Sequence, residues 1–128
     1  MNNNPSHQAA TIMIVDDELF YREVLRDMLS QAGFTIVAEA ADGAEAVAKY
    51  RTCHPAITIM DVFMPNMNGI EATKAIMAAD SNARVLVSTT MGFDDEIQAV
   101  MKAGARGEIS KPFLADEILA VIQKVLTE

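Results

Sequence analysis

The feature that most constrains this chain is a regular alternation between short apolar runs and longer segments with helical periodicity. The runs have the length of buried strands, and we expect strands at residues 11–15, 35–37, 57–60 and 85–87, with a weaker one near residue 109. Between them, the spacing of apolar residues predicts helices at 19–29, 44–50, 70–79, 97–103 and 118–126. Five strand–helix pairs predict an α/β domain in which five helices cover both faces of a doubly wound, five-stranded parallel sheet.

Two polar pairs mark the starts of predicted helices. Asp42 with Glu45, and Asn68 with Glu71, have the spacing at which a capping side chain and a Glu satisfy each other's free amides. We therefore expect helices to begin there. Tyr50 lies on the helix after Asp42, and we expect its ring to be partly covered at the surface.

Length and composition predict one folded domain. The chain has 128 residues, of which 51% are hydrophobic and 22% charged, a balance typical of globular proteins. We expect a flexible tail at residues 1–10 and the domain at 11–128. The net charge of -8 opposes binding to nucleic-acid phosphates, because that affinity comes from clustered Lys and Arg, of which there are 10.

Cysteine usage and hydropathy indicate a cytoplasmic protein. Cys53 is the single cysteine, so no intramolecular disulfide can form, and His54 with the remote His7 cannot complete a zinc site around it. Residues 1–10 lack the basic start and apolar core of a signal peptide. No apolar run approaches the roughly 20 residues that span a bilayer, so we expect no membrane association.

Three carboxylates follow expected strands: Asp16 and Asp17 come after the first strand, and Asp61 after the third. The alternation does not determine strand order, so we adopt the order 2-1-3-4-5 of one common class of doubly wound sheets, in which strands one and three are neighbours. Ligands bind at the carboxyl ends of such strands. Converging carboxylates repel one another unless a proton or cation lies among them, and Mg²⁺ suits oxygen ligands. The alternative is that Asp16 and Asp17 only cap the first helix.

Asp61 has the position of a nucleophile toward a phosphoryl donor, because it ends a buried strand beside the acidic pair. Such a reaction needs nearby positive charge. Lys111, at the end of the fifth strand and directly before Pro112, can supply an ammonium group. Thr89 and Thr90 end the fourth strand, where a hydroxyl can donate to a phosphoryl oxygen.

These residues occur in an order that resembles the response-regulator receiver domain of two-component systems, from about residue 11 to residue 126. The matching segments are Val15-Asp16-Asp17, Met60-Asp61-Val62-Phe63-Met64-Pro65 with Gly69, Ser88-Thr89, Ala103-Gly104-Ala105 and Lys111-Pro112-Phe113. The resemblance implies a flavodoxin-like (CheY-like) fold, Mg²⁺ as cofactor and a sensor histidine kinase as partner.

The resemblance also implies roles for single residues. Asp61 would be the phosphoacceptor and a Mg²⁺ ligand, Asp17 a direct ligand and Asp16 a ligand through water. The backbone carbonyl of Phe63 would complete the protein ligands.

Around the phosphoryl group, the resemblance implies that Thr89 is the switch hydroxyl and that Lys111 binds the phosphoryl oxygens. It also implies a cis peptide bond at Lys111–Pro112. Such a domain is a signalling module rather than an enzyme. It is similar to the stand-alone chemotaxis-type regulators, so we expect a monomer that changes its affinity for a target protein, for example one of chemotaxis or the flagellar motor.

Four positions are expected to modulate this activity. Thr90 replaces the smaller residue that is usual in the family, and Phe63 and Met91 are bulky apolar residues that flank the site. Glu108 stands where the family commonly has Tyr or Phe, which puts the aromatic part of the switch in doubt. We expect an outward Glu108 that pairs with Lys102 or Arg106.

Three alternatives to a working receiver have to be weighed. Phosphatases of the haloacid-dehalogenase type also use an aspartate nucleophile, but they carry a second Asp two positions later, where this chain has Phe63. A nucleotide-binding module would need glycines in the first turn, where Asp16, Asp17 and Glu18 would repel a pyrophosphate. The third alternative is a receiver-like interaction module that is never phosphorylated, and Glu108 keeps it open.

Overall fold

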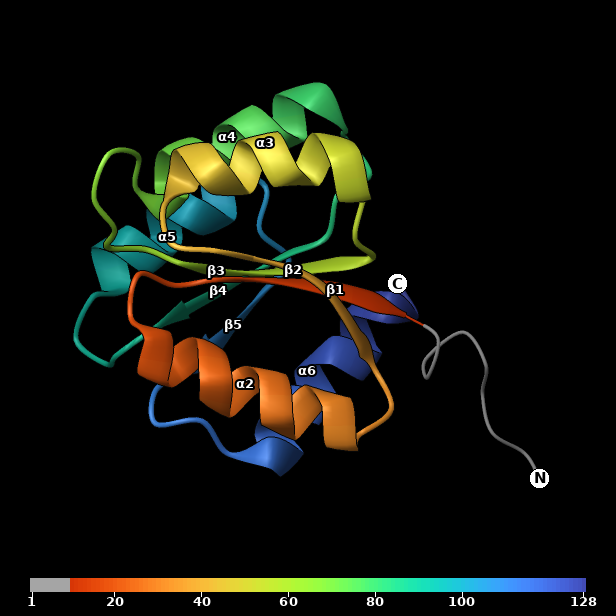
Figure 1. The fold of residues 1–128 in the computed structure, drawn as a ribbon. Coiled ribbons are helices and arrows are strands. Elements are labelled where there is room, and N and C mark those ends of the chain that lie inside the picture. The colour runs from red at the N-terminus through yellow and green to blue at the C-terminus, as the bar shows by residue number, and fades with distance from the viewer. Residues whose placement is uncertain (1–9) are drawn as a thin grey trace.

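A computed structural model describes residues 10–128, within which five parallel strands form one sheet in the order β2-β1-β3-β4-β5 (Figure 1). The strands are β1 (Thr11–Val15), β2 (Thr35–Ala40), β3 (Ile57–Asp61), β4 (Val85–Thr89) and β5 (Gly107–Ser110). The helices are α2 (Leu19–Gln31), α3 (Gly43–Cys53), α4 (Gly69–Ala79), α5 (Asp94–Ala103) and α6 (Ala115–Leu126). The predicted fold class and strand order are confirmed. Residues 1–9 of the expected tail lie outside the described residues.

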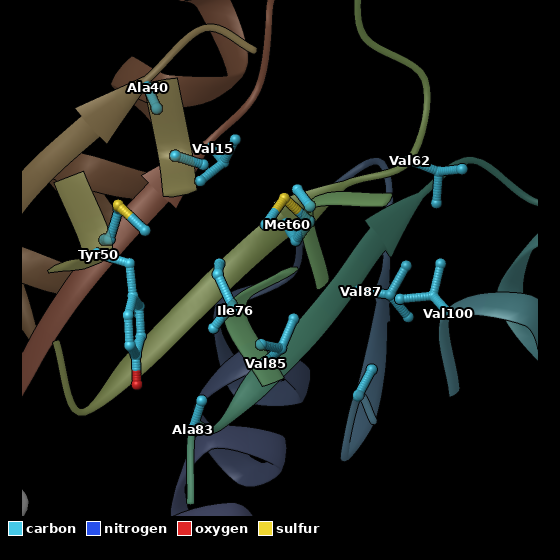
Figure 2. Packing of buried hydrophobic residues seen from close by; sticks show 14 residues of the cluster. Val15, Ala40, Tyr50, Met60, Val62, Ile76, Ala83, Val85, Val87 and Val100 are labelled. Atoms are coloured by element: carbon cyan, nitrogen blue, oxygen red, sulfur yellow. The ribbon is translucent and has the colours of Figure 1, made fainter. Parts of the chain in front are cut away.

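The helices form two layers, with α3, α4 and α5 on one face of the sheet and α2 and α6 on the other (Figure 1). Successive residues of a strand point to opposite faces, so each strand contributes to both layers. In β1, Met13 and Val15 pack in the layer of α3, α4 and α5, part of which Figure 2 shows. Ile12 and Ile14 pack against α2 and α6. This two-sided burial explains why the strands read as continuous apolar runs.

Polar caps define the starts of α3 and α4, as predicted. Asp42 Oδ1 accepts a hydrogen bond from the Glu45 amide at 2.8 Å, and Asn68 Oδ1 accepts one from the Glu71 amide at 2.9 Å. The Glu45 carboxylate in turn accepts from the Ala41 amide at 2.6 Å. Within residues 10–128, no helix has the length and apolar character needed to cross a bilayer.

The expectation for Tyr50 was wrong, because its ring is buried and only 4% exposed. The ring belongs to the apolar layer that also contains Ile76 and Ala83 (Figure 2). Its hydroxyl donates a hydrogen bond to Asp80 Oδ2 at 2.8 Å, and burial together with Asp80 raises the pKa of Tyr50 to about 12. Asp80, at the end of α4, lies next to the Tyr50 hydroxyl, and the residues around Tyr50 in the sequence do not predict this hydrogen bond.

Candidate functional site

Three carboxylates converge at the carboxyl-terminal edge of the sheet, which lies on the left in Figure 1. In the β1–β3 pair, Val15 lies opposite Met60, so Asp16, which follows β1, and Asp61, the last residue of β3, lie side by side at the end of these strands. Carboxylate oxygens of Asp16, Asp17 and Asp61 lie within 4.8 Å of one another. The convergence that the strand order predicts is therefore present.

Asp16 and Asp17 have different surroundings. Asp16 is buried, and its Oδ1 accepts a hydrogen bond from the Glu18 amide at 2.9 Å, whereas Asp17 is exposed to solvent. The N-cap of α2 is Glu18, which forms no side-chain capping bond. The alternative that the acidic pair only caps this helix is thus not supported.

Lys111 brings an ammonium group to the same place from the end of β5. Its Nζ lies 2.8 Å from Asp16 Oδ2 and 3.5 Å from Asp61 Oδ1, and its side chain is only 7% exposed. Burial by itself would lower the pKa of Lys111, but the interactions with Asp16 and Asp61 outweigh it and raise the pKa above its usual value. The peptide bond between Lys111 and Pro112 is cis.

Asp61 carries the most perturbed carboxyl group of the site. Its pKa is raised from 3.8 to about 7, mainly by burial and also by the negative charges of Asp16 and Asp17, while Lys111 opposes the rise. One ammonium group therefore does not balance three carboxylates. Further positive charge at the edge would lower this pKa and favour the ionised form of Asp61.

The backbone of the β3–α4 loop holds Asp61 in place. The Gly69 amide donates to the Val62 carbonyl at 2.8 Å, and a Cβ at Gly69 would overlap the Asp61 carbonyl oxygen. A side chain at Gly69 would thus displace the loop that carries Asp61 and Phe63. This close approach accounts for the glycine at position 69.

The two threonines at the end of β4 differ in environment. Ser88 pairs with Asp61 in the sheet register, and Thr89, the next residue, is buried, whereas Thr90 is exposed. Thr89 and Lys111 are also joined through the backbone, because the Lys111 amide donates to the Thr89 carbonyl at 3.0 Å. Thr89 therefore ends the strand between those that carry Asp61 and Lys111.

An aromatic pair joins the two loops that flank the site. The rings of Phe63, in the β3–α4 loop, and Phe93, just before α5, meet edge to face with centroids 4.7 Å apart. Met91, between β4 and α5, is 83% exposed. Phe93 was missed in the sequence, where nothing distinguishes it from an ordinary residue of a loop.

Two further residues on α2 touch the site and were not predicted. The ring centroid of Tyr21 lies 4.1 Å from Lys111 Nζ. Arg22 donates from Nη1 to the Asp16 carbonyl at 2.6 Å and forms an ion pair with Glu39 at 3.3 Å. Both lie one helical turn past the acidic pair, but only the packing of α2 against the sheet directs them to the site.

Glu108 faces outward, as expected, but its predicted ion pair is absent. Its register partner in β4 is Val87, and its side chain is exposed. Among residues 10–128, neither Lys102 nor Arg106 lies within ion-pair distance of it. Glu108 instead borders a small hollow between β5 and α6, together with Leu114.

Comparisons with known proteins agree with this geometry. Residues 12–123 match the family described as "Response regulator receiver domain". The chain is 43% identical to the chemotaxis protein CheY of Bacillus subtilis, with 92% of this chain and 98% of the relative covered, and 42% identical to CheY of Thermotoga maritima, with 89% and 95% covered. Its fold is similar to a chain in the CheX–CheY–BeF3–Mg²⁺ complex from Borrelia burgdorferi, with a TM-score of 0.88, 33% identity and 93% and 90% of the two chains covered.

Proposed function

The chain belongs to the response regulator receiver domain family, and from this premise we propose that it accepts a phosphoryl group on Asp61 from a sensor histidine kinase. The observation that carries the proposal is the position of Asp61, which is 5% exposed and lies between an acidic pair and the ammonium group of Lys111. Asp16 shares these neighbours but is 1% exposed, and its two carboxylate oxygens are engaged by the Glu18 amide and by Lys111.

The donor set of the site fits Mg²⁺. Three carboxylates offer oxygen ligands only, and Asp17 is open to solvent, as a metal that keeps several waters requires. We propose Asp17 and Asp61 as direct ligands, Asp16 as a ligand through water and the Phe63 carbonyl as the remaining protein ligand. The raised pKa of Asp61 is consistent with this proposal, because after burial, its main cause, the repulsion from Asp16 and Asp17 contributes to it. When bound, Mg²⁺ would supply charge that offsets both the carboxylates and the phosphoryl oxygens.

In the transfer step, a carboxylate oxygen of Asp61 attacks the phosphorus of a phosphohistidine. The O–P bond forms while the N–P bond breaks, and the released imidazole nitrogen takes up a proton. Lys111 would stabilise the phosphoryl oxygens as a buried point charge. Hydrolysis is a second displacement, in which water attacks the same phosphorus, the O–P bond to Asp61 breaks to restore the carboxylate, and inorganic phosphate is released.

The signal would arise from the neighbours of the phosphoryl group. Thr89 ends the strand next to Asp61, and its hydroxyl would donate to a phosphoryl oxygen. Thr90, Met91 and Phe63 would tune access for water, with Phe63 held by its edge-to-face contact with Phe93. The outcome would be a changed affinity for a target protein.

The similarity to chemotaxis proteins supports a more specific assignment. We place the chain in the cytoplasm as a monomeric receiver, with residues 11–128 as the domain and a chemotaxis or flagellar-motor protein as its target. One solved structural relative was crystallised with CheX, BeF3 and Mg²⁺, which is consistent with a phosphoryl-dependent partner. Neither nucleic acid nor a membrane is part of this proposal.

The test is covalent labelling by a small phosphoryl donor. With acetyl phosphate and Mg²⁺, the native chain should gain one phosphoryl group by intact-mass measurement, and peptide mapping should place it on Asp61. Asp61→Asn should stay unmodified because the amide is a poor nucleophile. Asp95→Asn, which removes an exposed carboxylate from the first turn of α5 at the same edge, should behave like the native chain.

Labelling of Asp61→Asn to the native extent would remove Asp61 from its role. A native chain that is never labelled, although it binds Mg²⁺, would instead favour the receiver-like interaction module. An aspartate-nucleophile phosphatase would be indicated by continuous hydrolysis of the donor that does not change the affinity of the chain for a target protein.

A further inference from the structure

We propose that Tyr21 is a positioning residue, which holds the ammonium group of Lys111 where it can bind a phosphoryl group on Asp61. The inference rests on the proposed function of Asp61 and goes beyond it, because Tyr21 belongs to none of the motifs that define the site. It rests on packing geometry around one buried cation.

The ammonium group of Lys111 lies over the ring of Tyr21. Tyr21 lies in the first turn of α2 and is half-buried, and its ring centroid is 4.1 Å from Lys111 Nζ. A cation at this distance is attracted by the negative face of the ring. The ammonium group therefore contacts an aromatic face as well as two carboxylate oxygens, those of Asp16 at 2.8 Å and Asp61 at 3.5 Å.

The ring is itself fixed by a second aromatic contact. Tyr21 meets Phe113 at an interplanar angle of 81° with centroids 5.7 Å apart. Phe113 is buried and lies two residues after Lys111, in the segment between β5 and α6. The contact thus joins the start of α2 to the chain that carries Lys111, so the ring and the cation are held relative to each other.

An aromatic face suits this position better than a charged or apolar group. A third carboxylate would neutralise the charge that the phosphoryl group needs, and an aliphatic side chain would give the cation no compensation for lost water. The attraction by the ring leaves the formal charge of Lys111 intact. Within residues 10–128, the Tyr21 hydroxyl makes no hydrogen bond, which indicates that the ring and not the hydroxyl performs this role.

The first measurement needs neither metal nor phosphate. Proton NMR of the unmodified protein should show the Lys111 Cε methylene shifted upfield by the ring current of Tyr21. The shift should persist in Tyr21→Phe and disappear in Tyr21→Leu. Phe20→Leu is the control for loss of a neighbouring aromatic ring, because Phe20 is exposed and meets the Tyr21 ring edge to face with centroids 5.2 Å apart, whereas the cation–π contact of Lys111 is with Tyr21.

The second measurement is the rate of labelling by acetyl phosphate at saturating Mg²⁺. Tyr21→Leu should be slower by about tenfold, which corresponds to about 1.4 kcal/mol, within the range for a desolvated cation over an aromatic ring. Tyr21→Phe should keep the native labelling rate, and Phe20→Leu should not change this rate. Thermal melts of all variants show whether a slow variant is folded.

A double mutant distinguishes positioning from a general structural effect. In a Lys111→Met background, Tyr21→Leu should cause no further loss of rate, because the cation that it positions is gone. Equal losses in both backgrounds would overturn the inference, as would a native rate in folded Tyr21→Leu. These outcomes differ from failure of the proposed function, in which the native chain itself would take no phosphoryl group and both proposals would fall.

Discussion

At the scale of single residues, the chemistry of this site depends on how many charges share one buried edge. Asp16, Asp17 and Asp61 approach within one coordination sphere, and Lys111 offsets only part of their repulsion. The effect is largest at Asp61, whose pKa rises to about 7. The unmetallated protein therefore stores repulsion that binding of a cation or loss of one carboxylate relieves.

This repulsion predicts a particular dependence of stability on pH. The pKa of Asp61 is raised from 3.8 to about 7 by burial and by its acidic neighbours, so between these values the folded state binds a proton that the unfolded state has lost. The contribution of Asp61 to the free energy of unfolding should accordingly fall as pH rises from about 4 to about 7. At pH 8 without divalent cations, Asp61→Asn should be more stable than the native chain by about 2 kcal/mol or more.

Urea unfolding in the presence of a chelator, repeated across this pH range, measures the effect. The advantage of Asp61→Asn should shrink as pH falls and approach zero below about pH 4, where the carboxyl group becomes protonated in the unfolded state as well as in the folded state. Asp95→Asn should give no comparable gain, since that carboxylate is exposed. An advantage that stays the same from pH 4 to pH 8 would contradict the assignment of the raised pKa to Asp61.

At the scale of elements, the unusual feature is the face of β5. Glu108 points outward from β5 without an ion-pair partner among residues 10–128. The resemblance to receivers implies that an aromatic residue at this position turns inward when the hydroxyl of Thr89 moves toward the phosphoryl group. Burial of the Glu108 carboxylate without a partner would cost several kcal/mol, so Glu108 should face outward in both states.

We therefore expect Thr89 to respond to phosphorylation while α5, β5 and α6 change little. Amide chemical shifts recorded with and without the phosphoryl group should change strongly near Asp61 and Thr89 and weakly on α5 and β5. Glu108→Tyr should enlarge the changes on α5 and β5, because an aromatic ring can fill the space that Thr89 leaves. A phosphoryl group can shift the conformation of α5 and β5 only through contacts that differ between their two conformations.

The control for this comparison is Glu23→Tyr, which places the same ring on α2, on the other face of the sheet. It should leave the pattern of the native chain unchanged. Large native shifts across α5 and β5 that Glu108→Tyr does not enlarge would show that the switch is not muted.

At the scale of the whole molecule, binding of the metal should be coupled to folding. The proposed ligands come from loops after β1 and β3, which are separated in sequence and meet only in the folded sheet. Mg²⁺ should therefore bind the folded state and raise the melting temperature. The stabilisation should be about 2.7 kcal/mol at a Mg²⁺ concentration 100 times the dissociation constant.

Thermal melts of the native chain and of Asp17→Ala, each with and without Mg²⁺, check this expectation. Without Mg²⁺, Asp17→Ala should melt at or above the native temperature because part of the repulsion is gone, and its response to Mg²⁺ should be weaker. Asp94→Ala, an exposed acid at the start of α5, should respond like the native chain. An undiminished response in Asp17→Ala would exclude Asp17 as a direct ligand.

The sequence by itself determined the elements and the chemistry-bearing residues at their ends. Periodicity and caps are local properties, so the helices that begin after Asp42 and Asn68 could be located from neighbouring residues alone. Asp61 was recognised because it directly follows an apolar run, and Lys111 because it ends the weaker fifth strand directly before Pro112. The strand order did not come from the residues but was adopted from a known class of sheets.

Only the tertiary structure decided which side chains meet across the layers. The burial of Tyr50, the aromatic pair of Phe63 and Phe93, and the contact of Tyr21 with Lys111 each join segments from different parts of the chain. No local pattern encodes such contacts, because they depend on how each helix is rotated and translated against the sheet. The burial of Asp61, which is the main cause of its raised pKa, and the distances around Lys111 also follow from that packing.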